Sequence, residues 1–273
     1  MLTVQTNMAS VRASKVVGQT RRALDVSFRK VSSGSRLAKV GEDSAGLGVS
    51  ENLETRSSSY RVAARNINDG ISVVQTAEQA VEASTSLLMR MRELAVQSAS
   101  ETLADTERSY IEDEFDELTE EIRRLGQSTT FNGILLADAT VPTIDVQVGI
   151  DSDSDSQITL SMPDLRSLFF AVSAETLATS GDAAAALDVF DDQLDTMNSS
   201  RAVLGADHNR LLASLEVAEQ SRLGLTRAAS AIADVDYATE LAQLSKLQIM
   251  QSAGVSALAQ TRNLSLAAID LLR

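Results

Sequence analysis

The clearest pattern in the sequence is a seven-residue spacing of apolar side chains in two separate stretches. The row in the first stretch is Leu53, Tyr60, Ile67, Val74, Val81, Leu88 and Ala95. A second row accompanies it, first four and later three residues away, as happens when a nearly straight helix drifts against a heptad repeat. At about 1.5 Å per residue, this stretch predicts a helical rod about 63 Å long.

The second stretch predicts another rod of similar length. Its row is Phe190, Met197, Leu204, Leu211, Ala218, Leu225 and Ile232. Two rods of matching length from opposite halves of a chain are expected to pack together and bury both apolar stripes. The turn signal Asn68-Asp69-Gly70 lies inside the first row. Because the row continues in register on both sides, we expect the helix to continue through it.

A shorter amphipathic helix is predicted between the two rods. Its apolar positions are Ile111, Phe115, Leu118, Ile122 and Leu125. Asp105 is the expected N-cap, Glu107 suits the first turn, and Gly126 is expected to end the helix.

A β-hairpin is predicted next, at about residues 143–162. Apolar and polar residues alternate from Ile144 to Ile150 and again from Ile158 to Met162, which is the pattern of two strands. The polar run 151–156 between them is the expected tip. The fold class is therefore mainly α, with long antiparallel helical rods and one β-hairpin region.

Both ends of the chain show helical apolar spacing with little chain around them to bury it. We expect such ends to be weakly ordered alone and to be covered by each other and by further copies. The residues expected to drive self-assembly are Val4, Met8, Val11, Val17, Leu24, Phe28, Val31, Leu241, Leu244, Leu247, Val255, Leu258, Leu266, Ile269 and Leu272.

Charge is distributed unevenly over the 273 residues, whose formal net charge is −14. Residues 1–45 carry eight basic and three acidic side chains, so the middle of the chain is strongly acidic. An acidic middle argues against nucleic-acid binding as the main role. By composition alone, the basic and Ser-rich start also fits a mitochondrial transit peptide. No apolar run reaches bilayer length or forms a secretory signal, so we expect neither membrane insertion nor export by a cleaved signal.

Candidate chemical sites are weak. Asp151, Asp153 and Asp155 match the first half of a calcium loop, but Ser156 and Met162 stand where Gly and Glu are needed. The chain has no Cys and one His, His208, which fits a helix interface better than a catalytic site. We therefore expect no catalytic residue, metal ligand or cofactor.

Several motifs together resemble those of the bacterial flagellins. Residues 31–49 read VSSGSRLAKVGEDSAGLGV and closely resemble the family's N-terminal signature, although Ser44 and Lys39-Val40-Gly41 depart from it. Residues 233–260 read ADVDYATELAQLSKLQIMQSAGVSALAQ and resemble the family's C-terminal block. Shorter matches are NINDGISVVQTAE at 66–78, RELAVQS at 92–98 and TFNG at 130–133.

The resemblance implies a secreted, non-enzymatic subunit of the flagellar filament outside the bacterium. It implies a terminal coiled coil, D0, from residues 1–44 and 236–273, and a helical bundle with the hairpin, D1, from residues 45–235. Because about twenty residues separate Met162 from the second rod, we expect no outer D2 or D3 domains. The implied partners are further copies or sister flagellins, an export chaperone, the type III export apparatus, and the hook-associated and cap proteins.

One segment also resembles the part of flagellins that a host Toll-like receptor reads. Residues 89–97 read MRMRELAVQ, and the resemblance implies receptor contacts by Arg90, Leu94 and Glu114. The alternative is that these residues serve subunit packing alone.

Two alternatives remain, the first within the same family and the second from another class of protein. A hook–filament junction protein shares the terminal signatures, but it is expected to depart more in the 92–98 and 233–260 blocks. A helical-rod signalling module also shows heptads, but it needs a membrane segment or partner domain.

Overall fold

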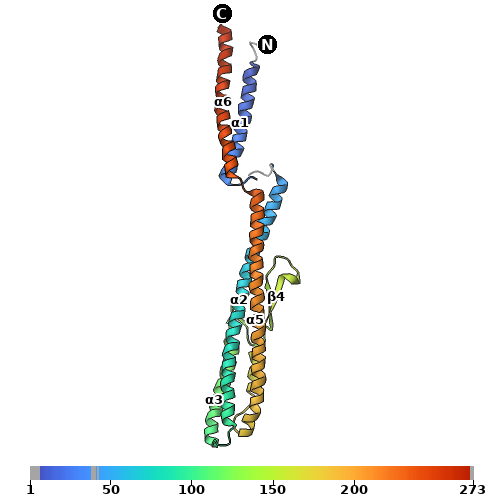
Figure 1. Ribbon diagram of the computed structural model, residues 1–273, viewed down its shortest axis with the longest axis vertical. Coiled ribbons are helices and arrows are strands. Elements are labelled where there is room, and N and C mark those ends of the chain that lie inside the picture. The colour runs from blue at the N-terminus through green and yellow to red at the C-terminus, as the bar shows by residue number, and fades with distance from the viewer. Residues whose placement is uncertain (1–6, 38–40, 42, 271–273) are drawn as a thin grey trace. The chain divides into compact units, whose positions relative to one another are not determined.

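The computed structural model describes residues 7–37, 41 and 43–270 (Figure 1). Its helices are α1 (Met8–Ser33), α2 (Ser44–Ser98), α3 (Asp105–Ser128), α4 (Leu165–Val172), α5 (Ser180–Ala233) and α6 (Tyr237–Asp270). Its strands are β1 (Thr130–Phe131), β2 (Ile134–Leu135), β3 (Thr143–Gln147) and β4 (Gln157–Ser161), with a short 3-10 turn, η1 (Ser154–Ser156), before β4. The predicted fold class, mainly helical with small antiparallel strand pairs, is confirmed.

The chain divides into two compact units. The first contains Met1–Thr55 and Gly224–Arg273, and the second contains Arg56–Leu223. Helices α2 and α5 each contribute residues to both units. We describe each unit by itself, beginning with the second.

The core of the second unit lies where the two heptad rows meet. Ile67, Val74, Val81 and Leu88 of α2 are fully buried, in one apolar cluster with the α5 row from Phe190 to Ala218. Phe115 of α3 joins the same cluster, with its ring centroid 5.8 Å from that of Phe190. The rods predicted from periodicity are thus single helices of 55 and 54 residues.

The turn signal Asn68-Asp69-Gly70 does not interrupt α2, which runs through it as predicted. Gly70 is buried at a close approach between helix and hairpin. A Cβ on Gly70 would lie 3.0 Å from Cγ2 of Val146 on β3 and 3.5 Å from Leu211 on α5. The glycine therefore provides space for packing, not a chain reversal.

The ends of α3 differ from the prediction. The N-cap is Ala104 and not Asp105, and its backbone N–H donates to the Glu107 carboxylate over 3.1 Å. Gly126 does not end the helix, which continues to Ser128. Gly126 is instead buried, and because it has no side chain, Leu165 of α4 can pack closely against it.

Two strand pairs are present in the described residues, although only one was predicted. The predicted hairpin pairs β3 with β4 from Thr143↔Ser161 to Gln147↔Gln157. The missed pair joins β1 to β2 through Asn132 and Gly133, both with positive φ. An Asn-Gly pair between extended residues is a strong signal for a tight hairpin, so the sequence did contain this information.

Buried polar groups fix the loops of this unit. The guanidinium of Arg108 is buried and donates to the carbonyls of Ser98 and Leu103, where α2 gives way to α3. The carboxylate of Glu112 accepts hydrogen bonds from the Leu177 N–H and from the Thr176 hydroxyl, the latter over 2.6 Å. These contacts hold the segment before α5 against α3.

Candidate assembly surface

The terminal helices α1 and α6 form an antiparallel pair in the first unit (Figure 1). The Asn7 side-chain amide donates to the Thr261 carbonyl over 2.9 Å, and the Ser27 hydroxyl donates to Glu240. Residue numbers therefore increase along α1 while they decrease along the facing side of α6, as in an antiparallel pair. A Cβ on Gly254 would lie 2.9 Å from Val17, so the two helices approach closely there.

The base of the pair is fixed by backbone contacts around Gly34. Gly34 ends α1 in the left-handed conformation with φ 72°, and its carbonyl accepts from the Val235 N–H over 3.0 Å. The Arg36 guanidinium donates to the Ile232 carbonyl over 2.8 Å, and the Arg36 N–H donates to Ala233 over 2.7 Å. The residues 31–49 motif thus binds the end of α5.

Asp236, immediately before α6, caps the start of this helix. Its carboxylate accepts from the Ala238 N–H over 3.0 Å and from the Thr239 hydroxyl over 2.7 Å. The Thr239 hydroxyl and the backbone N–H groups of Ala238 and Thr239 stabilise the charged carboxylate and lower its pKa. The aspartate of the residues 233–260 motif is therefore a helix cap.

The contact between α1 and α6 follows a heptad, but it is only half apolar. The seam positions, in alternating steps of three and four, are Ser10, Ala13, Val17, Thr20, Leu24, Ser27 and Val31 on α1, and Glu240, Leu244, Leu247, Gln251, Gly254, Leu258 and Thr261 on α6. The buried residues of α1 are the hydroxyl-bearing Thr20 and Ser27, and Leu247 is buried on α6. Small and polar side chains bury little apolar area, so the seam contributes weak intrinsic stability.

The expected assembly residues divide between this seam and the exposed surface. Val17, Leu24, Val31, Leu244, Leu247 and Leu258 lie in the seam, whereas Met8, Val11, Phe28, Leu241 and Val255 are exposed. Leu266 and Ile269 lie in α6. Val4 and Leu272 lie outside the described residues. The apolar positions predicted as one stripe on each helix thus belong to two surfaces. One surface faces the partner helix in the seam, and the other is exposed.

Sequence reasoning missed several exposed apolar residues of the terminal helices. Ile249 is 70% exposed, and Val16, Tyr237 and Met250 are also exposed, although none of them is among the predicted assembly residues. The sequence signal that could have found them is that they are apolar residues lying outside the helical rows. Apolar side chains that the partner helix does not cover form what we call the outer stripe: Met8, Val11, Val16, Phe28, Tyr237, Leu241, Ile249, Met250 and Val255.

The second predicted site, on the second unit, is only partly at the surface. Arg90 donates to Glu114 over 2.8 Å and to Glu93 over 3.1 Å, and the side chains of Arg90 and Glu114 are 48% and 45% exposed. Hydrogen bonds to Glu114 and Glu93 raise the pKa of Arg90. Leu94 is only 1% exposed, which corrects the expectation of a surface contact, because it belongs to the core cluster of α2.

Arg92, in the same segment, joins α2 to α5. Its guanidinium forms a fork with Asp191, with distances of 2.6 and 3.2 Å to the two carboxylate oxygens. This partner lowers the pKa of Asp191. His208, expected at a helix interface, is half-buried on α5.

The described residues hold no group of three or more His, Asp or Glu side chains arranged to bind a metal. Among the helices as described, none combines the length and hydropathy needed to cross a bilayer.

These features define a class of helical structural protein whose two chain ends pair and carry exposed apolar side chains. Comparison with known families identifies which one. Residues 4–141 match the N-terminal helical region of bacterial flagellin, and residues 187–272 match its C-terminal helical region. The chain belongs to the bacterial flagellin family.

Similar proteins agree with this assignment. A flagellin of Halalkalibacterium halodurans is 36% identical over 98% of both chains. A flagellar filament core protein of Treponema maltophilum is 29% identical over 97% of this chain and 98% of its own. The crystal structure of Bacillus cereus flagellin is 29% identical, with a TM-score of 0.51 over 56% of this chain and 88% of that one.

The chain is therefore a structural subunit that polymerises into the bacterial flagellar filament. Its place in the cell is the flagellum, and its principal partner is itself.

Proposed function

We propose that polymerisation proceeds through the terminal helices, with the outer stripe of α1 and α6 covered by neighbouring copies. The observation that carries this proposal is the exposure of nine apolar side chains on two helices that already pair with each other. Burying such side chains is favourable, and a filament offers many copies to cover them. The weak seam supports the same conclusion, because the pair gains stability when further copies surround it.

We also propose the division of the chain into filament domains. Residues 1–44 and 236–273 form D0, residues 45–235 form D1 with the hairpin, and no outer D2 or D3 domain is present. Support comes from the pairing of α1 with α6 and from the single apolar cluster of the second unit. Small alternative packings of D1 rods would then set the supercoil of the filament.

The route of assembly is part of the proposal. Subunits leave the cell unfolded through the type III export apparatus, escorted by an export chaperone, and fold beneath the cap at the filament tip, outside the bacterium. The hook-associated proteins join the filament to the hook. Folding and binding are coupled at the tip because the outer stripe finds cover only there.

The proposed Toll-like receptor contact depends on Arg90 and Glu114, since Leu94 is buried. Both side chains are half-exposed at the surface of α2 and α3, and they already form an ion pair. A receptor would therefore have to compete with Glu114 for the guanidinium.

The assembly proposal is tested by Ile249→Asn, with Gln248→Asn as the matched control on the neighbouring exposed position. Losing the burial of one isoleucine, about 1.5–3 kcal/mol, should raise the critical concentration for polymerisation roughly ten-fold to a hundred-fold. Sedimentation of filaments at a series of subunit concentrations measures it, with negative-stain microscopy as the check. Equal critical concentrations for the two variants would contradict the proposal.

A further inference from the structure

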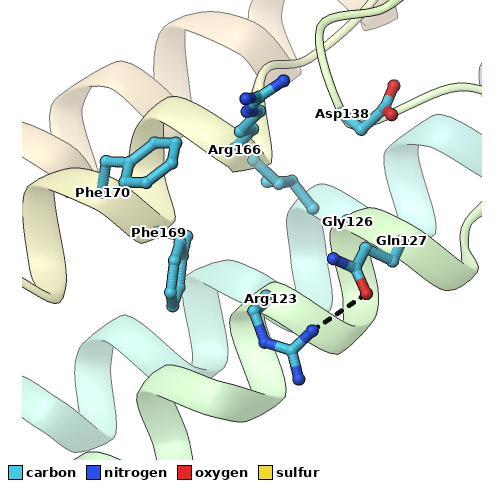
Figure 2. Close-up of a pocket in the computed structure, with 8 residues that line it drawn as sticks. Arg123, Gly126, Gln127, Asp138, Arg166, Phe169 and Phe170 are labelled. Carbon is cyan, nitrogen blue, oxygen red and sulfur yellow. Dashed lines mark hydrogen bonds between the residues drawn. The ribbon is translucent and has the colours of Figure 1, made fainter.

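A pocket of about 280 Å³ lies between the C-terminal end of α3 and helix α4, in the second unit (Figure 2). Arg123 and Gln127 line it from α3, Arg166, Phe169 and Phe170 from α4. Asp138 stands at its rim. The volume is small for a binding site of a free small molecule, and it suits one or two side chains of a projecting segment.

The guanidinium of Arg166 has all of its hydrogen-bond donors available within the described structure. It lies over the ring face of Phe170, 5.7 Å from the centroid, and its charge helps to lower the pKa of Asp138 at the rim. It makes no hydrogen bond or ion pair with another described residue. Arg123, by contrast, already donates to Glu120 and Gln127. Phe170 is 56% exposed, and its ring centroid lies 5.4 Å from that of Phe169, so an exposed apolar wall lies beside the Arg166 guanidinium.

The tip of the β3–β4 hairpin carries the complementary chemistry. Asp151, Asp153 and Asp155 are all exposed, and their carboxylates form no hydrogen bond or ion pair with a described residue. The acidic face of α3 is engaged in part. Glu112, Glu114, Glu120 and Glu121 bond to neighbours in their own chain. Asp113, Asp116 and Glu117 form no hydrogen bond or ion pair with a described residue, but they stand on the side of a helix. A narrow loop also enters a small pocket, whereas a helix face does not.

Net charge favours contacts that bring opposite charges together between copies. A subunit of charge −14 repels its neighbours, and a filament needs local attraction to offset this repulsion. A pocket arginine and three tip aspartates, none of which forms a hydrogen bond or ion pair through its side chain with a described residue, provide such an attraction.

We propose that the α3–α4 pocket receives the hairpin tip, residues 151–155, of a second copy of this chain. An aspartate of the tip accepts hydrogen bonds from Arg166 at the pocket mouth, and the adjoining backbone covers Phe170. The proposal rests on the filament function and adds a specific subunit contact to it.

Cross-linking between two single-cysteine chains tests the contact, because the natural chain has no Cys. Gln127→Cys marks the pocket and Ser152→Cys marks the tip, and neither change removes an arginine or an aspartate. The two variants are copolymerised and treated with a short bis-maleimide. Mixing separate chains means that a heterodimer reports a contact between copies only. Ser199→Cys, on an exposed position of α5 outside the pocket, replaces Gln127→Cys in the matched control.

A heterodimer in the filaments, absent from unpolymerised subunits and from the Ser199→Cys mixture, is the expected result. Adding Arg166→Glu to the pocket chain should abolish the heterodimer, and Arg166→Lys should retain it. Filaments without the heterodimer, or a heterodimer unaffected by Arg166→Glu, overturn the proposal and leave the filament function standing. Mass spectrometry that maps the cross-link of Gln127→Cys to another segment overturns it too. A mixture that forms no filaments contradicts the filament function itself.

Discussion

Gly70 on α2 packs closely against Val146 on β3, so that a Cβ added at position 70 would lie 3.0 Å from the valine Cγ2. Replacing Gly70 by Ala adds helix propensity worth up to about 1 kcal/mol, but it forces the hairpin away from the helix at a cost of about 1–3 kcal/mol. We expect a net loss of about 1 kcal/mol in the free energy of unfolding of the second unit, measured by denaturant unfolding.

Two companion variants decide the cause. Gly70→Ala with Val146→Ala should recover part of the loss caused by Gly70→Ala, because the smaller side chain restores the space. Gly205→Ala on α5 is the matched control, since a Cβ there meets nothing within 4 Å. It should stabilise the protein by about 0.5–1 kcal/mol. A destabilised Gly205→Ala would show that the argument from space is wrong.

The Phe115–Phe190 contact should be among the most sensitive in the core. Phe190 is fully buried, so Phe190→Ala should lower the free energy of unfolding by about 3–5 kcal/mol through lost burial and a residual cavity. Phe190→Leu fills most of that space and should cost clearly less. Thermal unfolding followed by circular dichroism measures both variants. Equal losses for Phe190→Ala and Phe190→Leu would show that cavity volume does not set the cost.

Arg108 should act as a structural cross-link between α2 and α3. Arg108→Met keeps the aliphatic volume and leaves the carbonyls of Ser98 and Leu103 without their donor, at an expected cost of about 1–3 kcal/mol. Hydrogen exchange should become faster in residues 98–104. Arg108→Lys retains one donor and should give an intermediate effect. Unchanged exchange in Arg108→Met would contradict this role.

Asp236 should make the start of α6 sensitive to acid. Its pKa is lowered by hydrogen bonds to the charged carboxylate, so its contribution to stability is present above the pKa of the unfolded chain and is lost as pH falls through the lower folded pKa. Asp236→Asn still caps the helix but does not titrate. Hydrogen exchange of the first turn of α6 is measured in filaments from neutral pH to below the ordinary pKa of an aspartate. It should accelerate at the acid end in the natural protein relative to Asp236→Asn. Parallel pH profiles for the natural protein and Asp236→Asn would contradict the role of the Asp236 carboxylate as a titrating helix cap.

Local patterns in the sequence carried most of the fold. The heptad rows determine α2 and α5 because each long helix buries one continuous face, and the two-residue period of β3 and β4 is equally direct. The β1–β2 pair was missed because its strands are two residues long, although Asn132-Gly133 signalled the turn. The cap of α3 was misplaced because Glu107, and not an N-cap side chain, satisfies the first backbone donor.

The assembly surface was predicted less completely, since periodicity identifies an apolar stripe but not its neighbour. Leu241 and Leu244 lie one turn apart, and α1 covers only the second. Ser27 and Glu240 bond to each other across the seam, although neither residue is apolar. Leu94 is buried because α2 has helices on more than one side, which a single row of apolar residues cannot show.

The hydrogen bond between Asn7 and Thr261 has a practical consequence for protein engineering. Cargo fused near the beginning of the chain and cargo fused near its finish would both be anchored at the same extremity of the helix pair. Such fusions would compete for one volume in a polymer. Two different labels on one subunit are therefore better separated by moving one of them to an exposed loop of the other unit, away from the α3–α4 pocket.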